Sequence, residues 1–235
     1  MTRTSKYIRI AGLVYLLEAI IAPIRNFYIP SKLSDGAAAN TAYIAHHSFL
    51  FRVGIVGDLF TGLLGLAVVL ILYRVFANVD KRQARLMVIL GGFMITPIYF
   101  VNTLNDAAVL LLANGSSSIL SNLQTEGLVQ LFLGMHAHGV LINEIFWGLW
   151  LFPFGVLMYK SGFLPKFLGI LAFINGVAYL IISFSGLLLP NHANALANVL
   201  LPALMGEVVI MLWFLIIGAR ERNPKTSEPQ KVPLA

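Results

Sequence analysis

The stretch GMHAHGVLINEIFWGLW, residues 134–150, is apolar enough to lie in a membrane, yet it contains two imidazoles, an amide and a carboxylate. These four side chains are His136, His138, Asn143 and Glu144. The stretch belongs to a longer apolar run over 128–158, and a helix needs about 20 apolar residues to cross the hydrocarbon core of a bilayer. The run therefore predicts a transmembrane helix that carries polar groups inside the membrane.

The composition of the whole chain agrees with this class. Of the 235 residues, 58% are hydrophobic and 11% are charged, with a mean hydropathy of +0.83. Soluble domains contain about 25% charged residues, so the excess apolar surface must face lipid. The chain has no cysteine, which excludes disulfides and thiolate metal sites.

Six segments of the chain are long and apolar enough to cross a bilayer. They are about 8–29, 48–76, 86–112, 128–158, 164–189 and 196–218. We predict an all-α bundle of six transmembrane helices, forming a single domain over 1–220. The first segment is too long for a signal peptide and contains Glu18, so we expect it to remain as the first helix. The tail at 221–235 has three prolines and little apolar content, which predicts a disordered cytoplasmic tail.

Two connections between these segments predict short interfacial helices in the outer loops. The first is 30–46, where Ser34 or Asp35 is a candidate helix cap, and the second is 113–126, with Ser117 or Ser118 in that role.

The basic residues predict the orientation of the bundle. Of the 16 Lys and Arg residues, thirteen fall in segments that lie on one side of the membrane. By the positive-inside rule, both termini are cytoplasmic and the protein is a multi-pass protein of the cell inner (plasma) membrane. The net charge of +6 therefore reports topology, and we expect no nucleic-acid partner. The thirteen residues are Arg3, Lys6, Arg9, Arg74, Lys81, Arg82, Arg85, Lys160, Lys166, Arg220, Arg222, Lys225 and Lys231.

Glycines recur every seven residues through the fourth and fifth segments. The series is Gly148, Gly155, Gly162, Gly169 and Gly176. A step of seven returns to nearly the same helix face, and small residues let membrane helices approach closely. With the central glycine in the turn, the spacing predicts a closely packed hairpin of these two helices.

The polar residues of the first four segments converge on one layer of the membrane. With a rise of 1.5 Å per residue from the basic boundary markers, several of them lie about 24–26 Å above the cytoplasmic boundary. They are Arg25, Asp58, Asn102, Asn143 and Glu144. Asp106 and Arg52 follow at about 32 Å and His136 at about 36 Å. Isolated charges in lipid cost about 2.5–3.5 kcal/mol each, so we expect these side chains to face a shared, outward-opening pocket.

Three stretches resemble a known family. They are LFRVGIVGDLFTGLLGLAVVLILYRVFANVD at 50–80, IFWGLWLFPFGVLMYKSGFLPKFLGILAFINGVAYLI at 145–181 and GEVVIMLWFLIIG at 206–218. They are similar to the bacterial integral membrane family labelled domain of unknown function 4386. The resemblance implies six helices in a single domain, and it implies no activity, substrate or cofactor.

Three functional hypotheses follow from the polar layer. In the first, the pocket binds or moves an amphipathic or lipid-derived small molecule. In the second, the protein is an intramembrane enzyme whose candidate catalytic residues are His136, Glu144 and Asp106. In the third, it is a structural or regulatory subunit whose polar groups only specify packing. The predicted ligand-binding residues are Arg25, Arg52, Asp58, Asn102, Asp106, His136, Asn143 and Glu144.

Cofactors and proton sites leave further alternatives. We predict no cofactor, although His136 with Glu144 or Asp106 could ligate zinc or iron, and an outer histidine could ligate a haem. His136 and His138 point about 200° apart on a helix, so they cannot share one ion. Glu18 and Glu207 lie near mid-membrane and are proton-relay candidates. The expected partners are the lipid bilayer and an amphipathic small molecule, with the oligomeric state left open.

Overall fold

The computed structural model describes residues 2–34, 36–115 and 120–219, and all regular structure in these ranges is helical. Six helical segments are long and apolar enough to cross a membrane. They are Arg3–Lys32, Ser48–Phe76, Lys81–Ala113, Asn122–Lys160, Lys166–Leu188 and Pro190–Ile216. The predicted all-helical, six-span architecture is therefore confirmed, and the chain is a multi-pass membrane protein.

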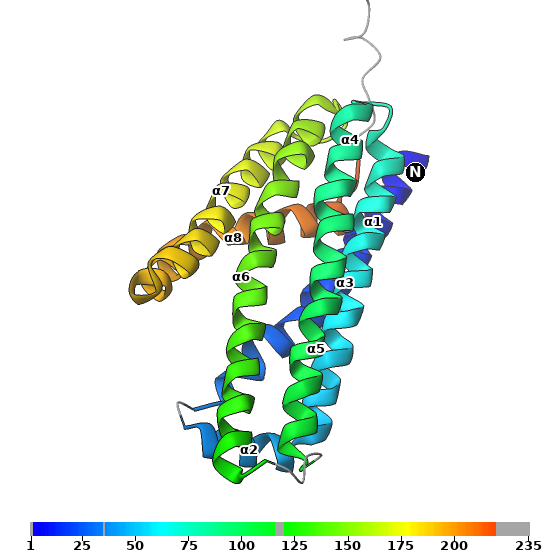
Figure 1. Cartoon of the computed structure of the whole chain (residues 1–235). Coiled ribbons are helices and arrows are strands. Elements are labelled where there is room, and N and C mark those ends of the chain that lie inside the picture. Colours follow the sequence, from blue (N-terminus) through cyan, green and yellow to red (C-terminus); the bar gives the residue numbers. More distant parts are fainter. Residues whose placement is uncertain (1, 35, 116–119, 220–235) are drawn as a thin grey trace, which may run out of the picture.

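The described residues contain eight α-helices and three short turns, and all of these except α2 belong to the spans. The first span joins α1 to a π-helical turn and a 3₁₀ turn, and the third joins α4 to α5 through a second π-helical turn (Figure 1). The helices are α1 (Arg3–Pro23), α2 (Ala37–His46), α3 (Ser48–Phe76), α4 (Lys81–Val88), α5 (Ile95–Ala113), α6 (Asn122–Lys160), α7 (Lys166–Leu188) and α8 (Pro190–Ile216). The turns are Ile24–Tyr28, Pro30–Lys32 and Ile89–Met94.

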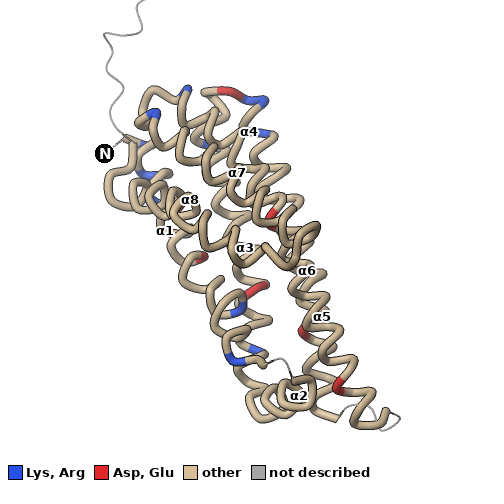
Figure 2. The backbone as a smooth tube through the Cα atoms, turned by 90° about the vertical axis from the view of Figure 1, so that its left-hand side faces the viewer, with Lys and Arg blue, Asp and Glu red and all other residues tan. Residues whose placement is uncertain are grey.

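The bundle has two distinct ends, which we call the α4 end and the α2 end (Figure 1). The start of α1 and the end of α8 meet at the α4 end, where Arg9 donates a hydrogen bond of 3.0 Å to the carbonyl of Ile216. Most Lys and Arg residues gather at this end (Figure 2). That clustering is the pattern from which we predicted orientation, and the cytoplasmic placement of the termini remains a prediction.

An exposed polar contact links the α3–α4 turn to the end of α6. Asp80 caps α4 by accepting a hydrogen bond from the backbone N–H of Gln83, and its carboxylate lies 3.1 Å from the ammonium of Lys160. The backbone donor and the neighbouring ammonium hold the pKa of the Asp80 carboxyl below its usual range.

Of the two short helices predicted in the outer loops, one is present and the other does not occur among the described residues. The connection at 30–46 does contain a short helix, α2, but its N-cap is Gly36, which makes no side-chain capping bond. The prediction of Ser34 as the cap is therefore wrong, and Asp35 lies outside the described residues. In the connection at 113–126, no separate helix occurs among the described residues. There, Ser121 and Gln124 form a reciprocal capping box, and α6 begins at Asn122, before the predicted start at 128. Ser117 and Ser118 lie outside the described residues. The predicted tail at 221–235 also lies outside them.

The glycine-spaced hairpin of α6 and α7 is confirmed. A Cβ placed on Gly155 would lie 2.8 Å from the carbonyl oxygen of Gly169, and one on Gly148 would lie 2.7 Å from that of Gly176. Gly162 occupies the turn with a positive φ of 71°, a conformation that glycine adopts without strain. The two helices therefore touch backbone to backbone, which only glycine permits at these four positions.

Two hydrophobic clusters fill the interior, and polar residues separate them. The larger cluster lies toward the α4 end and includes Val68, Tyr99 and Trp150, whereas the smaller one includes Phe51 and Val109 near the α2 end. In α3, α5 and α6 the buried polar residues lie between the positions that belong to the two clusters. The fold thus positions a buried polar layer between two apolar cores.

Candidate functional site

Four side chains from four different segments meet in the buried polar layer. They come from the π-helical turn after α1, from α3, from α5 and from α6, and each is at most 4% exposed. They are Arg25, Asp58, Asp106 and His136. All four were predicted from their heights in the membrane, and we refer to them as the buried quartet.

Arg25 enters the layer through local backbone geometry. Pro23 ends the regular part of α1, and the chain continues in a π-helical turn that contains Arg25. Such turns widen a helix locally and occur frequently at functional sites. On the facing helix, a Cβ on Gly54 would lie 3.2 Å from Cδ of Arg25. The glycine therefore leaves room for the arginine stem to pass α3.

Arg25 and Asp106 form a bidentate ion pair. Nε donates to Oδ2 at 2.8 Å and Nη2 donates to Oδ1 at 2.6 Å. This two-pronged geometry is the strongest that a guanidinium and a carboxylate make. It fixes the Asp106 carboxylate in orientation and ties α1 to α5 within the membrane.

His136 lies between the two carboxylates of the quartet. Its Nδ1 is 3.2 Å from Oδ2 of Asp106, and its Nε2 is 3.9 Å from Oδ2 of Asp58. Neither ring nitrogen makes a hydrogen bond of acceptable geometry, and Oδ1 of Asp58 also has no hydrogen-bond partner among the described residues. Buried polar atoms are usually paired, so these three atoms without hydrogen-bond partners are exceptional within the quartet.

Amide groups border the quartet. Asn102 donates a hydrogen bond of 3.0 Å to the carbonyl of His136 and accepts one of 3.0 Å from Asn105. A Cβ on Gly139 would collide with the amide of Asn102, so α5 and α6 cross closely at this point. Asn143 is buried as well, and its Oδ1 has no partner among the described residues.

Glu144 does not join the quartet, contrary to our expectation of a shared pocket. It lies on the face of α6 that holds Leu141 and Gly148, both of which contact α7, and it interacts electrostatically with Tyr179 of that helix. One residue of a helix turns the side chain by about 100°. That rotation separates Glu144 from Asn143 and the His136 face.

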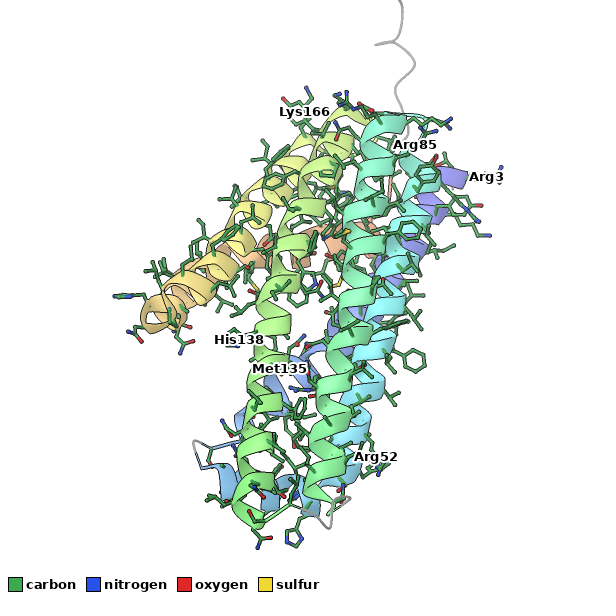
Figure 3. The ribbon with its side chains drawn as sticks, in the orientation of Figure 1. Arg3, Arg52, Arg85, Met135, His138 and Lys166 are labelled. Carbon is green, nitrogen blue, oxygen red and sulfur yellow. The ribbon has the colours of Figure 1, made fainter. Side chains whose placement is uncertain are left out.

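Arg52 also lies apart from the quartet, so the expectation that it shares a cavity with Asp106 and His136 is wrong. It is exposed on α3 and lines a smaller hollow with Asn114 and several apolar side chains of α3 and α5. Figure 3 shows Arg52 on the α3 side of the bundle, whereas Met135 and His138 lie on the α6 side. The arginine within reach of Asp106 is Arg25.

The two proton-relay candidates come close to Tyr179 of α7. Glu207 accepts hydrogen bonds from the Tyr179 hydroxyl at 3.1 Å and from the Asn175 amide at 3.3 Å. Glu18 interacts electrostatically with Tyr179, and the absence of a side chain on Gly65 leaves room for its carboxyl group. The structure thus brings both residues, together with Glu144, to one place, although it does not test a role in proton transfer.

A large open groove runs between α5 and α6 on the opposite face of α6 from His136. Its volume is about 1010 Å³, and it extends along α6 from Gly127 to Ile142, which corresponds to about 22 Å of helix. Apolar side chains form most of its wall, and its polar groups are the side chains of Asn102, Asn105, Gln130 and His138. The remaining lining residues are Ala37, Pro97, Ile98, Val101, Leu131, Gly134, Met135 and Gly139.

Sequence reasoning missed this groove because it searched for charged residues. A Cβ on Gly127 or Gly134 would meet no heavy atom within 4 Å, so these glycines leave free space rather than a close helix contact. Glycine costs about 1 kcal/mol relative to alanine in a helix. Both positions lie in the same seven-residue register as Gly148 and Gly155, although Leu141 interrupts the series, and that register was the available signal.

One group of residues has the composition and proximity of a metal site. Asp58, Asp106 and His136 each offer a ligand atom, and these three atoms lie within 4.8 Å of one another. The predicted pairing of His136 with Asp106 is therefore geometrically feasible. The alternative pairing with Glu144 is not supported, because Glu144 faces α7.

Comparison with known proteins identifies a family but no activity. The family described as domain of unknown function (DUF4386) matches residues 10–218. An uncharacterised protein of Archaeoglobus fulgidus is 36% identical over 91 residues, which make up 37% of this chain and 51% of that relative. The chain therefore spans about half the length of this curated relative. No solved structure matches the chain significantly.

Proposed function

The chain belongs to the family described as domain of unknown function (DUF4386). Because that description names no activity, we propose a function from the structure: the protein binds an elongated, largely apolar molecule in the α5–α6 groove. The single observation that carries this proposal is the groove, with its volume of about 1010 Å³ and its mostly apolar wall. Ligand pockets are typically 300–1,000 Å³ and mostly apolar, with a few polar groups that fix orientation. The ligand would enter sideways from the bilayer.

The polar groups of the groove restrict the head of this ligand. Asn105, Gln130 and His138 offer amides and an imidazole, whereas no Asp, Glu, Lys or Arg among the described residues lines the groove. The two arginines that we predicted as ligand-binding residues do not line the groove, since Arg25 is bonded to Asp106 and Arg52 lines another hollow. We therefore propose an amphipathic ligand with an uncharged hydrogen-bonding head, such as a long-chain alcohol or a related lipid-derived compound.

Glycine substitution in the groove tests the proposal. Because nothing lies within 4 Å of a Cβ on Gly134, Gly134→Leu should fold normally and fill the groove with its side chain. The probe is a long-chain alcohol that carries a photoactivatable diazirine. The variant should lower specific labelling about tenfold, whereas Val199→Leu on the exposed surface of α8 should leave it unchanged. Equal labelling of both variants and the wild type would show that the groove is not the binding site.

The intramembrane-enzyme alternative has one observation in its favour, the grouping of Asp58, Asp106 and His136. In this alternative the His/carboxylate group would act by itself or with a bound metal or haem. The structural-subunit alternative is favoured by the bidentate pairing of Arg25, but it leaves the open groove without a role.

Two further assignments remain our proposals. We place the protein in the cell inner (plasma) membrane with both termini in the cytoplasm, which would open the α2 end of the groove to the outside. We also propose that Glu18 and Glu207 hold protons. Infrared spectroscopy of Glu207→Gln should show the loss of a protonated carboxyl band, and an unchanged spectrum would rule out that assignment for Glu207.

A further inference from the structure

The buried quartet lacks one positive charge. Arg25 contributes +1, Asp58 and Asp106 contribute −1 each, and a neutral His136 contributes nothing, so the sum is −1. All four side chains are at most 4% exposed. Burying an uncompensated negative charge is costly, so the quartet favours a bound cation. A divalent ion would bring the sum to +1, which an anionic exogenous ligand on the ion would balance.

The atoms without hydrogen-bond partners lie where such a cation would bind. Oδ1 of Asp58 and both ring nitrogens of His136 lack partners among the described residues. Asp58 and His136 are 1% and 3% exposed, respectively, so water does not replace the missing partners at the surface. Each of these atoms offers a lone pair or a proton that the protein does not use.

The contact between His136 and Asp106 has the geometry of two ligands that share an ion. Nδ1 and Oδ2 are 3.2 Å apart, yet the direction between them is not that of a hydrogen bond. Two ligands that each lie about 2.0–2.2 Å from one ion are separated by about 3.0–3.5 Å. One ligand atom from each of Asp58, Asp106 and His136 lies within 4.8 Å of the other two, so the three residues are close enough to surround one ion.

We propose that Asp58, Asp106 and His136 bind one divalent first-row transition-metal ion inside the membrane. One imidazole and two carboxylates suit Mn²⁺, Fe²⁺ or Zn²⁺. The ligands come from α3, α5 and α6, and three protein ligands leave positions open for an exogenous ligand. Asp58, Asp106 and His136 do not line the α5–α6 groove, so the metal site does not depend on the proposed ligand of the groove.

Arg25 acts in this site as a positioning residue. Its bidentate bond holds the Asp106 carboxylate in place without contact to the ion. Outer partners of metal-bound carboxylates typically change metal affinity by 10–100-fold when they are mutated. Arg25→Lys, which keeps the charge but loses the two-pronged geometry, should therefore weaken metal binding about tenfold.

Metal titration of the purified full chain tests the proposal. The protein in detergent is stripped with a chelator and titrated with Mn²⁺, and the free ion is counted by electron paramagnetic resonance; Zn²⁺ is titrated in parallel and counted by elemental analysis. We expect one ion per wild-type chain. Asp58→Asn and His136→Gln should each weaken binding at least tenfold. Glu144→Gln removes a carboxylate from the α7-facing side of the same helix as His136 and is the matched control, with unchanged binding.

Thermal unfolding separates loss of the site from loss of the fold. The metal should raise the Tm of the wild type and of Glu144→Gln, but it should not raise the Tm of a cooperatively unfolding Asp58→Asn variant. Absence of both ions from the wild type, or equal binding to the wild type and Asp58→Asn, would overturn the proposal. The charge of the quartet would then be balanced by a proton on one of its own side chains, and nitrogen-15 NMR of the metal-free protein would show whether the His136 ring carries it.

Discussion

Replacement of Arg25 by methionine removes the cation that pairs with Asp106 but keeps most of the aliphatic stem. The pair is bidentate, at 2.6 and 2.8 Å, and Asp106 is fully buried. Removal of one partner of a buried pair costs about 3–5 kcal/mol, because the other charge stays buried without compensation. For a chain of this length, about 2–4 °C of Tm accompanies each kcal/mol. We therefore expect Arg25→Met to lower the Tm by about 6–20 °C.

The rescue of this variant separates a charge effect from a packing effect. Addition of Asp106→Asn to Arg25→Met removes the stranded carboxylate and should recover at least half of the lost Tm. The assay is thermal unfolding in one detergent with a chelator present, so that metal binding does not contribute. The control is Arg52→Met, which removes an exposed arginine that forms no ion pair with the described residues and should change stability by less than about 0.5 kcal/mol. Strict additivity of the two mutations, or an equal effect of Arg52→Met, would refute the reasoning.

Three further predictions concern packing, topology and pH. Gly155→Leu should lower stability by about 1–3 kcal/mol through overpacking. Gly186→Leu should have a smaller effect, because its Cβ meets only the flexible side-chain end of a leucine. Equal losses of stability in thermal unfolding would contradict a special role for the glycines that recur every seven residues in α6 and α7. A cysteine at Asn194 should react with an impermeant thiol reagent in intact cells and one at Gln83 should not, and the reverse labelling would invert the orientation. Because the pKa of the Asp80 carboxyl is lower in the folded protein than in the unfolded chain, ionised Asp80 stabilises the fold above the usual pKa of an aspartate. This stabilisation is lost as the pH falls through the folded-state pKa. Asp80→Asn should therefore lower stability at neutral pH, and unfolding scans should show that the difference from the wild type disappears in acid.

The height of a polar residue in the membrane could be predicted, but the direction of its side chain could not. The regular rise of a helix placed Arg25, Asp58, Asp106 and His136 in one layer, and the structure brings them together. The same calculation included Glu144, whose side chain instead faces α7. Direction depends on which helix packs against which face, and that arrangement is a property of the whole bundle.

The glycine spacing predicted the packing of α6 against α7, because that packing depends only on the short turn between the two helices. Two helices joined by a short turn must pack as a hairpin, so Gly155 and Gly169 could be paired by counting from the turn. The groove glycines Gly127 and Gly134 follow the same spacing, but there α6 diverges from its partner and the glycines border empty space. A sequence pattern alone does not distinguish a glycine that allows contact from one that leaves room.

The central claim is that the α5–α6 groove holds an elongated, uncharged amphipathic molecule. The most direct measurement is mass spectrometry of peptides from the wild-type protein after illumination with the diazirine-bearing long-chain alcohol. We predict that the labelled positions fall on the groove wall, at Ile98 and Val101 of α5 and at Leu131 and Met135 of α6, and that excess unlabelled alcohol prevents the labelling. Labels spread evenly over exposed apolar residues such as Phe49 and Val199, without competition by unlabelled alcohol, would contradict the account.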